Sequence, residues 1–573
     1  MSGGPPLAMK DGGSVLQSPS LARFSRAERD PRTVIRDFSQ ECQGLTCPEY
    51  APRIASSFCK VDTAGQIERQ FVDAFQQSHL KSRATYFMIG ITLLYATLGT
   101  LYAVLTPPWQ VPDEPAHFNY VKYIATEGRL PELRQGDYPH DYLEELKRRR
   151  FPLDMPIDGI RYEFHQPPLY YLLLAPIYRL AGVYPSLPML LTLRLCTLLL
   201  GVASLWVGYR VVGAIYPDRP LLAVGTAGFA ATLPMHLAMT AAVNNDVLAE
   251  LLLGLVTLSL VTKGGMRWSM KRTMLLGALL GLCLLTKLQA YVGFGIALFA
   301  LLYDAWRLRH NSGAYPWRLV FTRALILGGV ALALASPWLL RNARVYGLDD
   351  LWAQGRHAEV VAGQLTTADY VTQVGLPTFL RRLVVTTFQS FWGQFGWMGV
   401  VLHPRFYLGA LALCGIAGLG LVHYAASWLR QGHRLPLETR RGLGLLAVWA
   451  LLTTAGFVWY NLWYVQHQGR YLFPAIVPWG LFFALGMYQV LAPAMRITVL
   501  TLLVVLAGLL LSGLFTGDIK SFTLLLLALL ALGLGIGHRL EERWPGTAML
   551  LFFVCMGSIA LTCLLGYIIP GLS

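Results

Sequence analysis

Residues 85–106 read TYFMIGITLLYATLGTLYAVLT, and residues 107–123 read PPWQVPDEPAHFNYVKY. The first stretch is long and apolar enough to cross a bilayer, which takes about 20 residues of helix. The second stretch places two adjacent carboxylates, Asp113 and Glu114, directly beyond it. Ionisable groups held within or directly against a membrane commonly mark function. The junction therefore predicts a membrane helix that delivers an acidic loop to one membrane surface.

The composition of the whole chain is that of a multi-pass membrane protein. Of its 573 residues, 55% are hydrophobic and 14% are charged, and the mean hydropathy is +0.47. A soluble protein carries about 25% charged residues. The net charge of +15 could suit nucleic acid, but the basic residues lie in short loops between apolar runs. That distribution is typical of cytoplasmic loops, so we expect membrane lipids around the protein and no nucleic acid.

The apolar runs predict an all-α polytopic membrane protein with about thirteen transmembrane helices. With the N-terminus in the cytoplasm, the basic loops fall on the inner side, as the positive-inside rule requires. We therefore expect a multi-pass protein of the cell (plasma) membrane. The predicted spans lie near 85–106, 188–213, 220–241, 246–262, 273–288, 289–305, 320–341, 405–428, 442–462, 471–491, 496–513, 519–537 and 546–569.

The segment 168–184 is apolar but short, and Pro176 interrupts it. Counting it as a span would place every later basic loop outside. We therefore interpret it as an interfacial or re-entrant helix on the outer face. Two long outer loops follow from this choice, at about 107–187 and 342–404.

Three regions are expected along the chain. Residues 1–84 are rich in Gly, Pro, Ser and charge, and predict a partly disordered cytoplasmic segment. Residues 85–490 would form a transmembrane module that carries both outer loops. Residues 491–573 would add further transmembrane helices.

The acidic pair allows three interpretations. Asp113 could cap the helix that begins at Pro115, because a proline in the first turn and an acidic residue before it are typical of a helix start. A carboxylate could instead act as general base on an acceptor hydroxyl, with Glu114 as helper. The two carboxylates could also hold a divalent cation, Mg or Mn, against a phosphate. His117 lies one helical turn further on and could join either role, or be an interfacial histidine.

The motif FHQPPLYY at 164–171 is the second polar element of the first outer loop. Its two prolines could simply start the interfacial helix, with the tyrosines in the headgroup zone. Alternatively, His165 and Gln166 are polar groups held rigidly at the membrane surface, where they could contact a sugar or a phosphate.

Several cations are expected at outer helix ends, although membrane proteins keep most of their cations inside. Binding of an anionic lipid phosphate would explain them. Snorkelling, or pairing with nearby acids and headgroups, is the alternative. The candidate phosphate-binding residues are Lys287, Arg341, Arg344, His467 and Arg470.

The acidic pair, the HQPPL element and the thirteen-span plan together resemble the GT-C glycosyltransferases. Within that group, the stretches DEPAHF, SFWGQFGWM (390–398) and QGRYLFPA (468–475) are similar to a branch of bacterial membrane proteins. The resemblance covers about residues 85–490. It implies a polyprenyl-phosphate-linked sugar as donor and places the family's catalytic carboxylate at Asp113. His-Gln precedes Pro-Pro here, where better-known branches differ, and this leaves the role of His165 open.

The sequence thus favours an inverting membrane glycosyltransferase that acts on the non-cytoplasmic face, with a lipid, glycan or protein as acceptor. No P-loop occurs, and the glycine-rich runs lie within spans, so no nucleotide cofactor is expected. Two alternatives stay open. One is a transporter or flippase of lipid-linked glycans, which would carry charge near mid-membrane. The other is a non-catalytic scaffold in envelope polysaccharide assembly.

Overall fold

The computed structural model describes residues 63–183, 188–262, 268–312, 316–361, 364–431 and 435–573. The chain divides into two compact units, 1–75 and 76–573. Of the first unit only the beginning of helix α2 (Thr63–Leu105) is described, so the expected disorder near the N-terminus lies outside the described residues. The expected boundary at residue 84 falls inside α2. All further description concerns the second unit.

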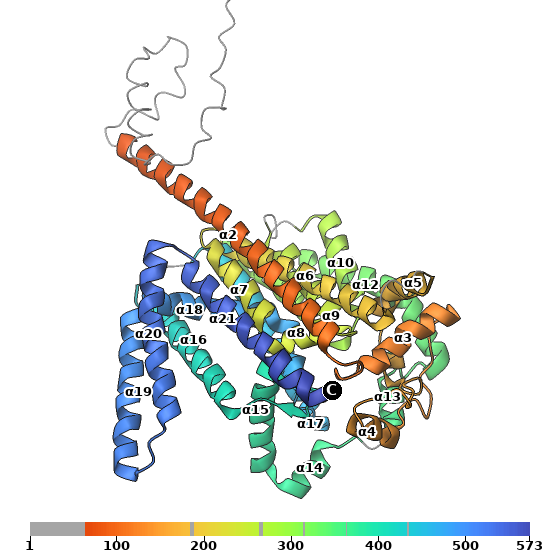
Figure 1. Ribbon diagram of the computed structural model, residues 1–573. Coiled ribbons are helices and arrows are strands. Elements are labelled where there is room, and N and C mark those ends of the chain that lie inside the picture. Colours follow the sequence, from red (N-terminus) through yellow and green to blue (C-terminus); the bar gives the residue numbers. More distant parts are fainter. Residues whose placement is uncertain (1–62, 184–187, 263–267, 313–315, 362–363, 432–434) are drawn as a thin grey trace, which may run out of the picture. The chain divides into compact units, whose positions relative to one another are not determined.

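The prediction of an all-α polytopic membrane protein is confirmed (Figure 1). Within the described residues, ten helical segments are long and apolar enough to cross a bilayer. They are formed by α2, α6 (Met189–Ile215), α11 (Val292–Ser312), α12 (Trp317–Tyr346), α16 (Pro404–Gln431), α17 (Leu437–Trp463), η5 with α18 (Gly469–Ala475 and Ile476–Leu491), α19 (Met495–Thr516), α20 (Ser521–Arg543), and α21 (Thr547–Cys563) continued to Leu572.

The expected count of thirteen spans is not confirmed. Helices α7 (Pro220–Thr232) and α8 (Pro234–Thr240) are bent by 72° and add at most one span. The break occurs at Leu233, because the residue before a proline avoids the helical conformation. Helices α9 (Asp246–Val261) and α10 (Met270–Leu284) cover the other two expected spans with 16 and 15 residues. At 1.5 Å per residue, about 24 Å of helix is short of a hydrocarbon core of about 30 Å.

Two long connections gather at one end of the helix bundle, which we call the loop end. The first connection joins α2 to α6 and contains α3 (Glu114–Glu127), α4 (His140–Arg148), the 3₁₀ turn η3 (Tyr162–His165) and α5 (Leu169–Val183). The second joins α12 to α16 and contains α13 (Gln354–Val360), α14 (Thr367–Val374), α15 (Leu376–Gly393) and the strands β1 (Gln394–Phe395) and β2 (Val400–Val401). Helix α5 is apolar and 15 residues long, so it is shorter than a span, as expected.

The aromatic stretch at 390–398 does not form one continuous helix. Helix α15 ends at Gly393, and β1 pairs antiparallel with β2. The turn between the strands has a positive φ at Gly396, Trp397 and Met398. From this hairpin the Trp397 indole Nε1 donates to the carbonyl of Trp109, at 3.0 Å. The hairpin therefore fastens the second connection to the first.

Small residues allow α10 and α12 to pack closely. A Cβ added at Gly277 would lie 2.9 Å from the Cβ of Val330, and one at Gly281 would lie 2.9 Å from the Cβ of Leu334. These distances are too short for real contacts, so larger residues would push the helices apart. Gly277 and Gly281 form a GxxxG motif that allows close packing of the two helices.

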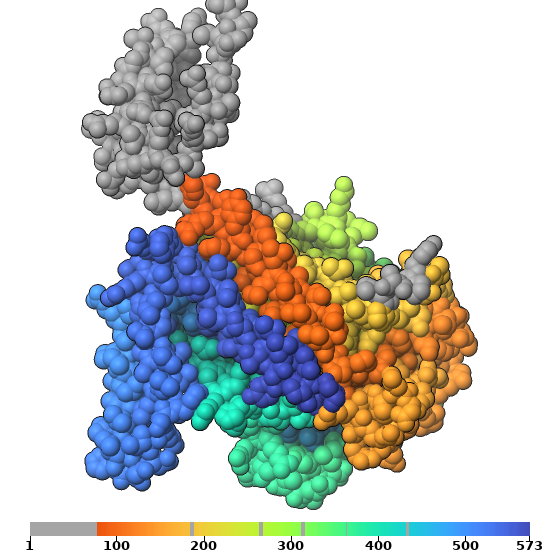
Figure 2. All heavy atoms as spheres, in the orientation of Figure 1, coloured from red at the N-terminus to blue at the C-terminus, as the bar shows by residue number. Residues whose placement is uncertain are grey.

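Figure 2 shows a hollow on the face drawn there, between the blue helices α19 and α20 and the green segment that contains α14 and α15. Helix α16 lies between these two groups in the same view. Helices α19 and α20 are mostly exposed: only 17% and 11% of their apolar 18-residue stretches are buried. Helices α19 and α20 are therefore peripheral. The other helices form the compact part of the bundle, to which the loop end is attached.

Candidate functional site

Asp113 lies at the start of α3 in a left-handed conformation, with φ 68°. For a residue with a side chain this conformation costs about 1–2 kcal/mol. The carbonyl of Asp113 accepts from the amide of His117 at 3.0 Å, as a helix start requires. The carboxylate does not cap the helix: its oxygens bind Tyr162 and Arg470. The capping interpretation is therefore wrong, and the strained backbone serves to aim the side chain.

The carboxylate of Asp113 joins an aromatic hydroxyl and a buried cation. The Tyr162 hydroxyl donates to Oδ1 at 2.7 Å, and Arg470 Nη2 lies 2.5 Å from Oδ2. The Arg470 side chain is 3% exposed and that of Asp113 is 22% exposed. Arg470 Nε also donates to Gln468 Oε1 at 2.7 Å, which fixes the direction of the guanidinium. A solvent-accessible carboxylate thus faces a buried arginine.

The pKa of Asp113 lies well below its usual range. Burial would raise this pKa, but the attraction of the Arg470 and His117 side chains, with the hydrogen bonds from Arg470 and Tyr162, outweighs burial. Asp113 is therefore ionised throughout the physiological pH range. While Arg470 holds it, however, it is a weak proton acceptor.

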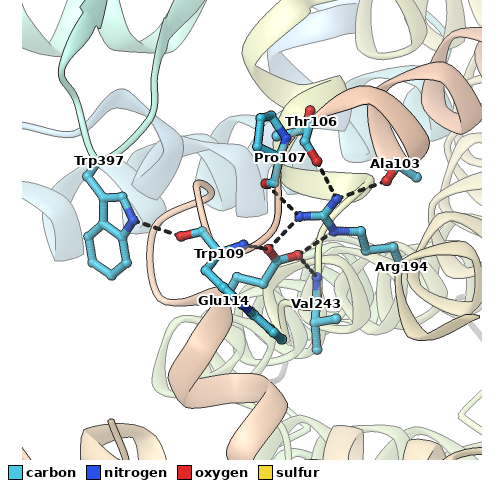
Figure 3. Close-up of polar contacts among 8 residues, drawn as sticks. All are labelled: Ala103, Thr106, Pro107, Trp109, Glu114, Arg194, Val243 and Trp397. Atoms are coloured by element: carbon cyan, nitrogen blue, oxygen red, sulfur yellow. Dashed lines mark hydrogen bonds and ion pairs between the residues drawn. The ribbon is translucent and has the colours of Figure 1, made fainter. Parts of the chain in front are cut away.

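Glu114 is next in sequence but has a different environment (Figure 3). Its side chain is fully buried and receives both Nε and Nη2 of Arg194, at 2.7 and 2.6 Å. The amides of Trp109 and Val243 donate to the same carboxylate, each at 3.2 Å. Glu114 therefore anchors the loop, and its expected role as a catalytic helper is not supported. Arg194 also donates to the carbonyls of Ala103, Thr106 and Pro107.

The acidic pair does not fit a divalent cation. The oxygens of Asp113 are taken by Arg470 and Tyr162, and those of Glu114 by Arg194 and backbone amides. The part of the chain that the structure describes contains no group of three or more His, Cys, Asp or Glu that could hold a metal. Adjacent positions in the sequence suggested a shared ligand set, but the left-handed turn at Asp113 sends the two side chains to different partners. We derive no step through a metal.

A second group of buried polar side chains surrounds His117. Its Nδ1 lies 2.8 Å from the Tyr171 hydroxyl. Burial lowers the pKa of His117, although the nearby carboxylates Glu163, Asp113 and Asp246 oppose this effect. Lys287 lies within the same electrostatic neighbourhood and forms an ion pair with Asp246 at 2.5 Å. Lys287 thus lies near His117 and has an acidic partner there, while its expected role in phosphate binding stays a prediction.

Glu163 is a site residue that the sequence analysis missed. It is 9% exposed, and its carboxyl interacts electrostatically with His117, Asp113 and Lys287. The signal was present in the sequence, because Glu163 directly precedes the motif FHQPPLYY (164–171) and lies two residues before His165. It was overlooked because a single acidic residue in a long loop is usually solvated.

His165 is held by its own turn. Its Nδ1 donates to the carbonyl of Tyr162 at 2.9 Å, which leaves Nε2 as an acceptor. The ring of His357, from α13, lies 4.0 Å away between centroids. Burial lowers the pKa of His165 to about 4, so the ring is neutral near pH 7. The carbonyl of Gln166 accepts from the hydroxyl of Tyr120 at 3.1 Å.

Three further candidates have other surroundings. Arg341 lies over the ring of Tyr346 at 5.3 Å and donates to the carbonyl of Pro131, so it fastens the first connection. Arg344 is exposed. His467 packs edge-on against Phe379, with the ring centroids 5.2 Å apart. Of the five predicted phosphate-binding residues, Arg470 contacts Asp113 directly. Lys287 interacts electrostatically with His117 and Glu163, which lie near Asp113.

No family model and no curated protein matches the chain. Among solved structures, the chain is similar to ArnT from Cupriavidus metallidurans bound to undecaprenyl phosphate, with a TM-score of 0.48 and 15% identity over 84% of this chain and 76% of that chain. The apo ArnT structure gives a TM-score of 0.47 at the same identity, covering 84% of this chain and 77% of that chain.

A further similarity is to the Archaeoglobus fulgidus oligosaccharyltransferase, with a TM-score of 0.37 and 14% identity over 76% of this chain and 52% of that chain. Because every TM-score is below 0.5, we argue function from the residues of the site alone. The expected bacterial branch stays a prediction.

Proposed function

We propose that this protein is a membrane glycosyltransferase that moves a sugar from a polyprenyl-phosphate carrier to a hydroxyl of a lipid, glycan or protein acceptor. One observation carries the proposal: at the loop end of an apolar bundle, the partly accessible carboxylate of Asp113 meets the buried guanidinium of Arg470, at 2.5 Å. A carboxylate can take a proton from an acceptor, and a cation can hold a lipid phosphate. We place the site on the non-cytoplasmic face, on the basis of the charge distribution of the loops.

The proposed step needs one proton acceptor and one anion site. Asp113 takes the proton of the acceptor hydroxyl, and the acceptor oxygen forms a bond to the anomeric carbon from the face opposite the phosphate. The bond from the anomeric carbon to the phosphate oxygen breaks, and its electron pair stays on the phosphate. The configuration is thereby inverted. The phosphate gains one negative charge, which Arg470 and Lys287 would stabilise.

The ion pair between Asp113 and Arg470 implies that the donor binds before the acceptor is deprotonated. Asp113 is a poor base while Arg470 is bound to it, and the phosphate of the donor would compete for the same guanidinium. Binding of the donor would draw Arg470 away and return Asp113 towards its ordinary basicity. The acceptor would then be deprotonated only when a donor is present.

Replacing Arg470 with Gln is expected to lower kcat/KM for the lipid-linked donor by about 10²–10³-fold, the usual loss when one donor to a developing anion is removed. The measurement is transfer of radiolabelled sugar in membranes at several donor concentrations. Arg149→Gln is the matched control, because Arg149 is half-exposed and pairs with Asp154 away from the site. Equal rates for wild type and Arg470→Gln would contradict the phosphate assignment.

A transporter or flippase of lipid-linked glycans is the second candidate, and one observation favours it. His236 and Glu250 form a buried pair inside the bundle, with Nε2 and Oε2 3.0 Å apart, beside the break between α7 and α8. Ionisable residues and broken helices inside a bundle are typical of transporters. Flipping of a fluorescent lipid-linked sugar in proteoliposomes, abolished by Glu250→Gln but not by Asp113→Asn, would favour this candidate.

A further inference from the structure

We propose that Glu163 binds a hydroxyl group of a substrate through its carboxyl oxygen Oε2, beside Asp113. The inference rests on the proposed function, because it assigns a hydroxyl-bearing ligand to the same site. It adds a recognition residue that takes no part in the proton transfer or phosphate binding described above.

One oxygen of the Glu163 carboxyl, Oε2, lacks the protein partner that its burial would require. The residue is 9% exposed, yet none of the described residues makes a hydrogen bond to its Oε2. A buried polar atom without a partner costs about 1–3 kcal/mol. Glu114, by contrast, is fully buried and receives four hydrogen bonds from Arg194, Trp109 and Val243. The fold thus satisfies one buried glutamate fully and leaves the other with a free oxygen.

The position of Glu163 connects this free oxygen to the reacting groups. Glu163 lies in η3 between Tyr162, whose hydroxyl donates to Asp113 at 2.7 Å, and His165, whose ring is bonded to the same turn. Its carboxyl also interacts electrostatically with His117 and Asp113. One short turn therefore presents a donor to the catalytic carboxylate and a second carboxyl to the same neighbourhood.

The chemistry of the neighbourhood selects the ligand. A phosphate anion has no proton to donate to Oε2 and would be repelled by an ionised carboxyl, so a phosphate does not fit against this oxygen. A hydroxyl is neutral, and it can donate to a carboxylate or accept from a carboxylic acid. Burial raises the pKa of Glu163, which shifts the carboxyl towards its neutral form, and a hydroxyl can bond to either form. The hydroxyl belongs to the transferred sugar or to the acceptor.

A stability comparison without substrate tests whether the free oxygen is a ligand site. Glu163→Gln is expected to leave the apparent Tm of the purified protein in detergent unchanged or to raise it, because Glu163 costs stability when no ligand is bound. Glu114→Gln, the matched control, is expected to lower the Tm, because it disrupts a complete network. A fall in Tm for Glu163→Gln equal to that for Glu114→Gln would show that Glu163 is structural and overturn the proposal.

Binding and transfer then identify the source of the hydroxyl. The probes are undecaprenyl phosphate alone and undecaprenyl-phosphate-linked hexoses, with their deoxy analogues. If the hydroxyl belongs to the sugar, the hexose-bearing carrier raises the Tm of wild type more than the bare carrier does, and Glu163→Ala abolishes that difference. Removing the matching hydroxyl from the sugar should then slow wild type by at least tenfold and leave the rate of Glu163→Ala unchanged.

The acceptor as source predicts a different pattern: Glu163→Ala keeps the Tm difference between the two carriers but slows transfer of every hexose by a similar factor, at least tenfold. A variant that keeps both the Tm difference and the transfer rates overturns the proposal. If wild type transfers none of the hexoses, the proposed function fails by itself. The Tm values with the hexose-bearing and the bare carrier then decide whether Glu163 binds a hydroxyl of the sugar. If Glu163→Ala keeps the Tm difference between the two carriers, that assignment is refuted.

Discussion

Replacing Asp113 with Asn is expected to reduce sugar transfer from lipid-linked donors by about 10²–10⁴-fold, the usual contribution of a general base. Asparagine has nearly the same shape and can still accept the hydrogen bond of Tyr162 through its amide oxygen. It cannot take a proton, and it leaves the Arg470 guanidinium without its charged partner. The loss should therefore appear in kcat, with a smaller effect on the amount of folded protein.

The assay for this prediction uses membranes that contain wild type or variant, and a panel of radiolabelled polyprenyl-phosphate sugars. Asp158→Asn is the matched control, because Asp158 lies on the same connection but is 56% exposed and pairs with Lys122. That control should keep its activity within about twofold of wild type, since exposed ion pairs contribute little. If a donor is consumed and Asp113→Asn consumes it as fast as wild type does, Asp113 is not the catalytic base.

Replacing Arg194 with Met is expected to destabilise the protein by about 3–5 kcal/mol, because it leaves the Glu114 carboxylate buried without its charged partner. The change also removes the donor to three carbonyls at and just beyond the end of α2. We expect a strong fall in apparent Tm in detergent and little full-length protein in the membrane. Few single changes elsewhere in the bundle should have an effect of this size.

Lys122→Met gives the comparison for this second prediction. Lys122 forms an ion pair of similar length with Asp158, at 2.6 Å, but its side chain is 41% exposed. Its loss should cost less than about 1 kcal/mol. The double variant Arg194→Met with Glu114→Leu should recover part of the stability, but not all of it, because the amides of Trp109 and Val243 would still lack an acceptor. Normal stability of Arg194→Met would refute the anchoring role of the pair.

The helical membrane architecture could be predicted from the sequence, and so could the placement of Asp113 and Arg470 on one membrane surface. Apolar runs identify the membrane helices, and the charge of the loops assigns Asp113 and Arg470 to one surface, although 357 positions separate them. The count of spans could not be predicted, because hydropathy does not show that Pro234 breaks a helix by 72°.

The roles of neighbouring carboxylates were also beyond the sequence. Asp113 and Glu114 are adjacent, yet a positive φ sends one to Arg470 and the other to Arg194. The partner of Glu114, Arg194, lies within an apolar span, where the sequence gives no sign of a link to the loop. The burial of Glu163 depends on the folded connection around it, and no local pattern shows it. The sequence shows where polar residues cluster, but it does not show which of them already have hydrogen-bond or ion-pair partners in the folded protein.

The hydrogen bond between Trp397 and Trp109 makes the two long connections mechanically continuous. The carbonyl of Trp109 is held by the hairpin, and its amide is held by Glu114, the residue that follows Asp113. A molecule that pulls the hairpin away from the bundle would thus also strain the backbone on which the Asp113 carboxylate is mounted. A bulky acceptor or an accessory protein that reaches only residues 394–401 could in this way change the alignment of a group it never touches.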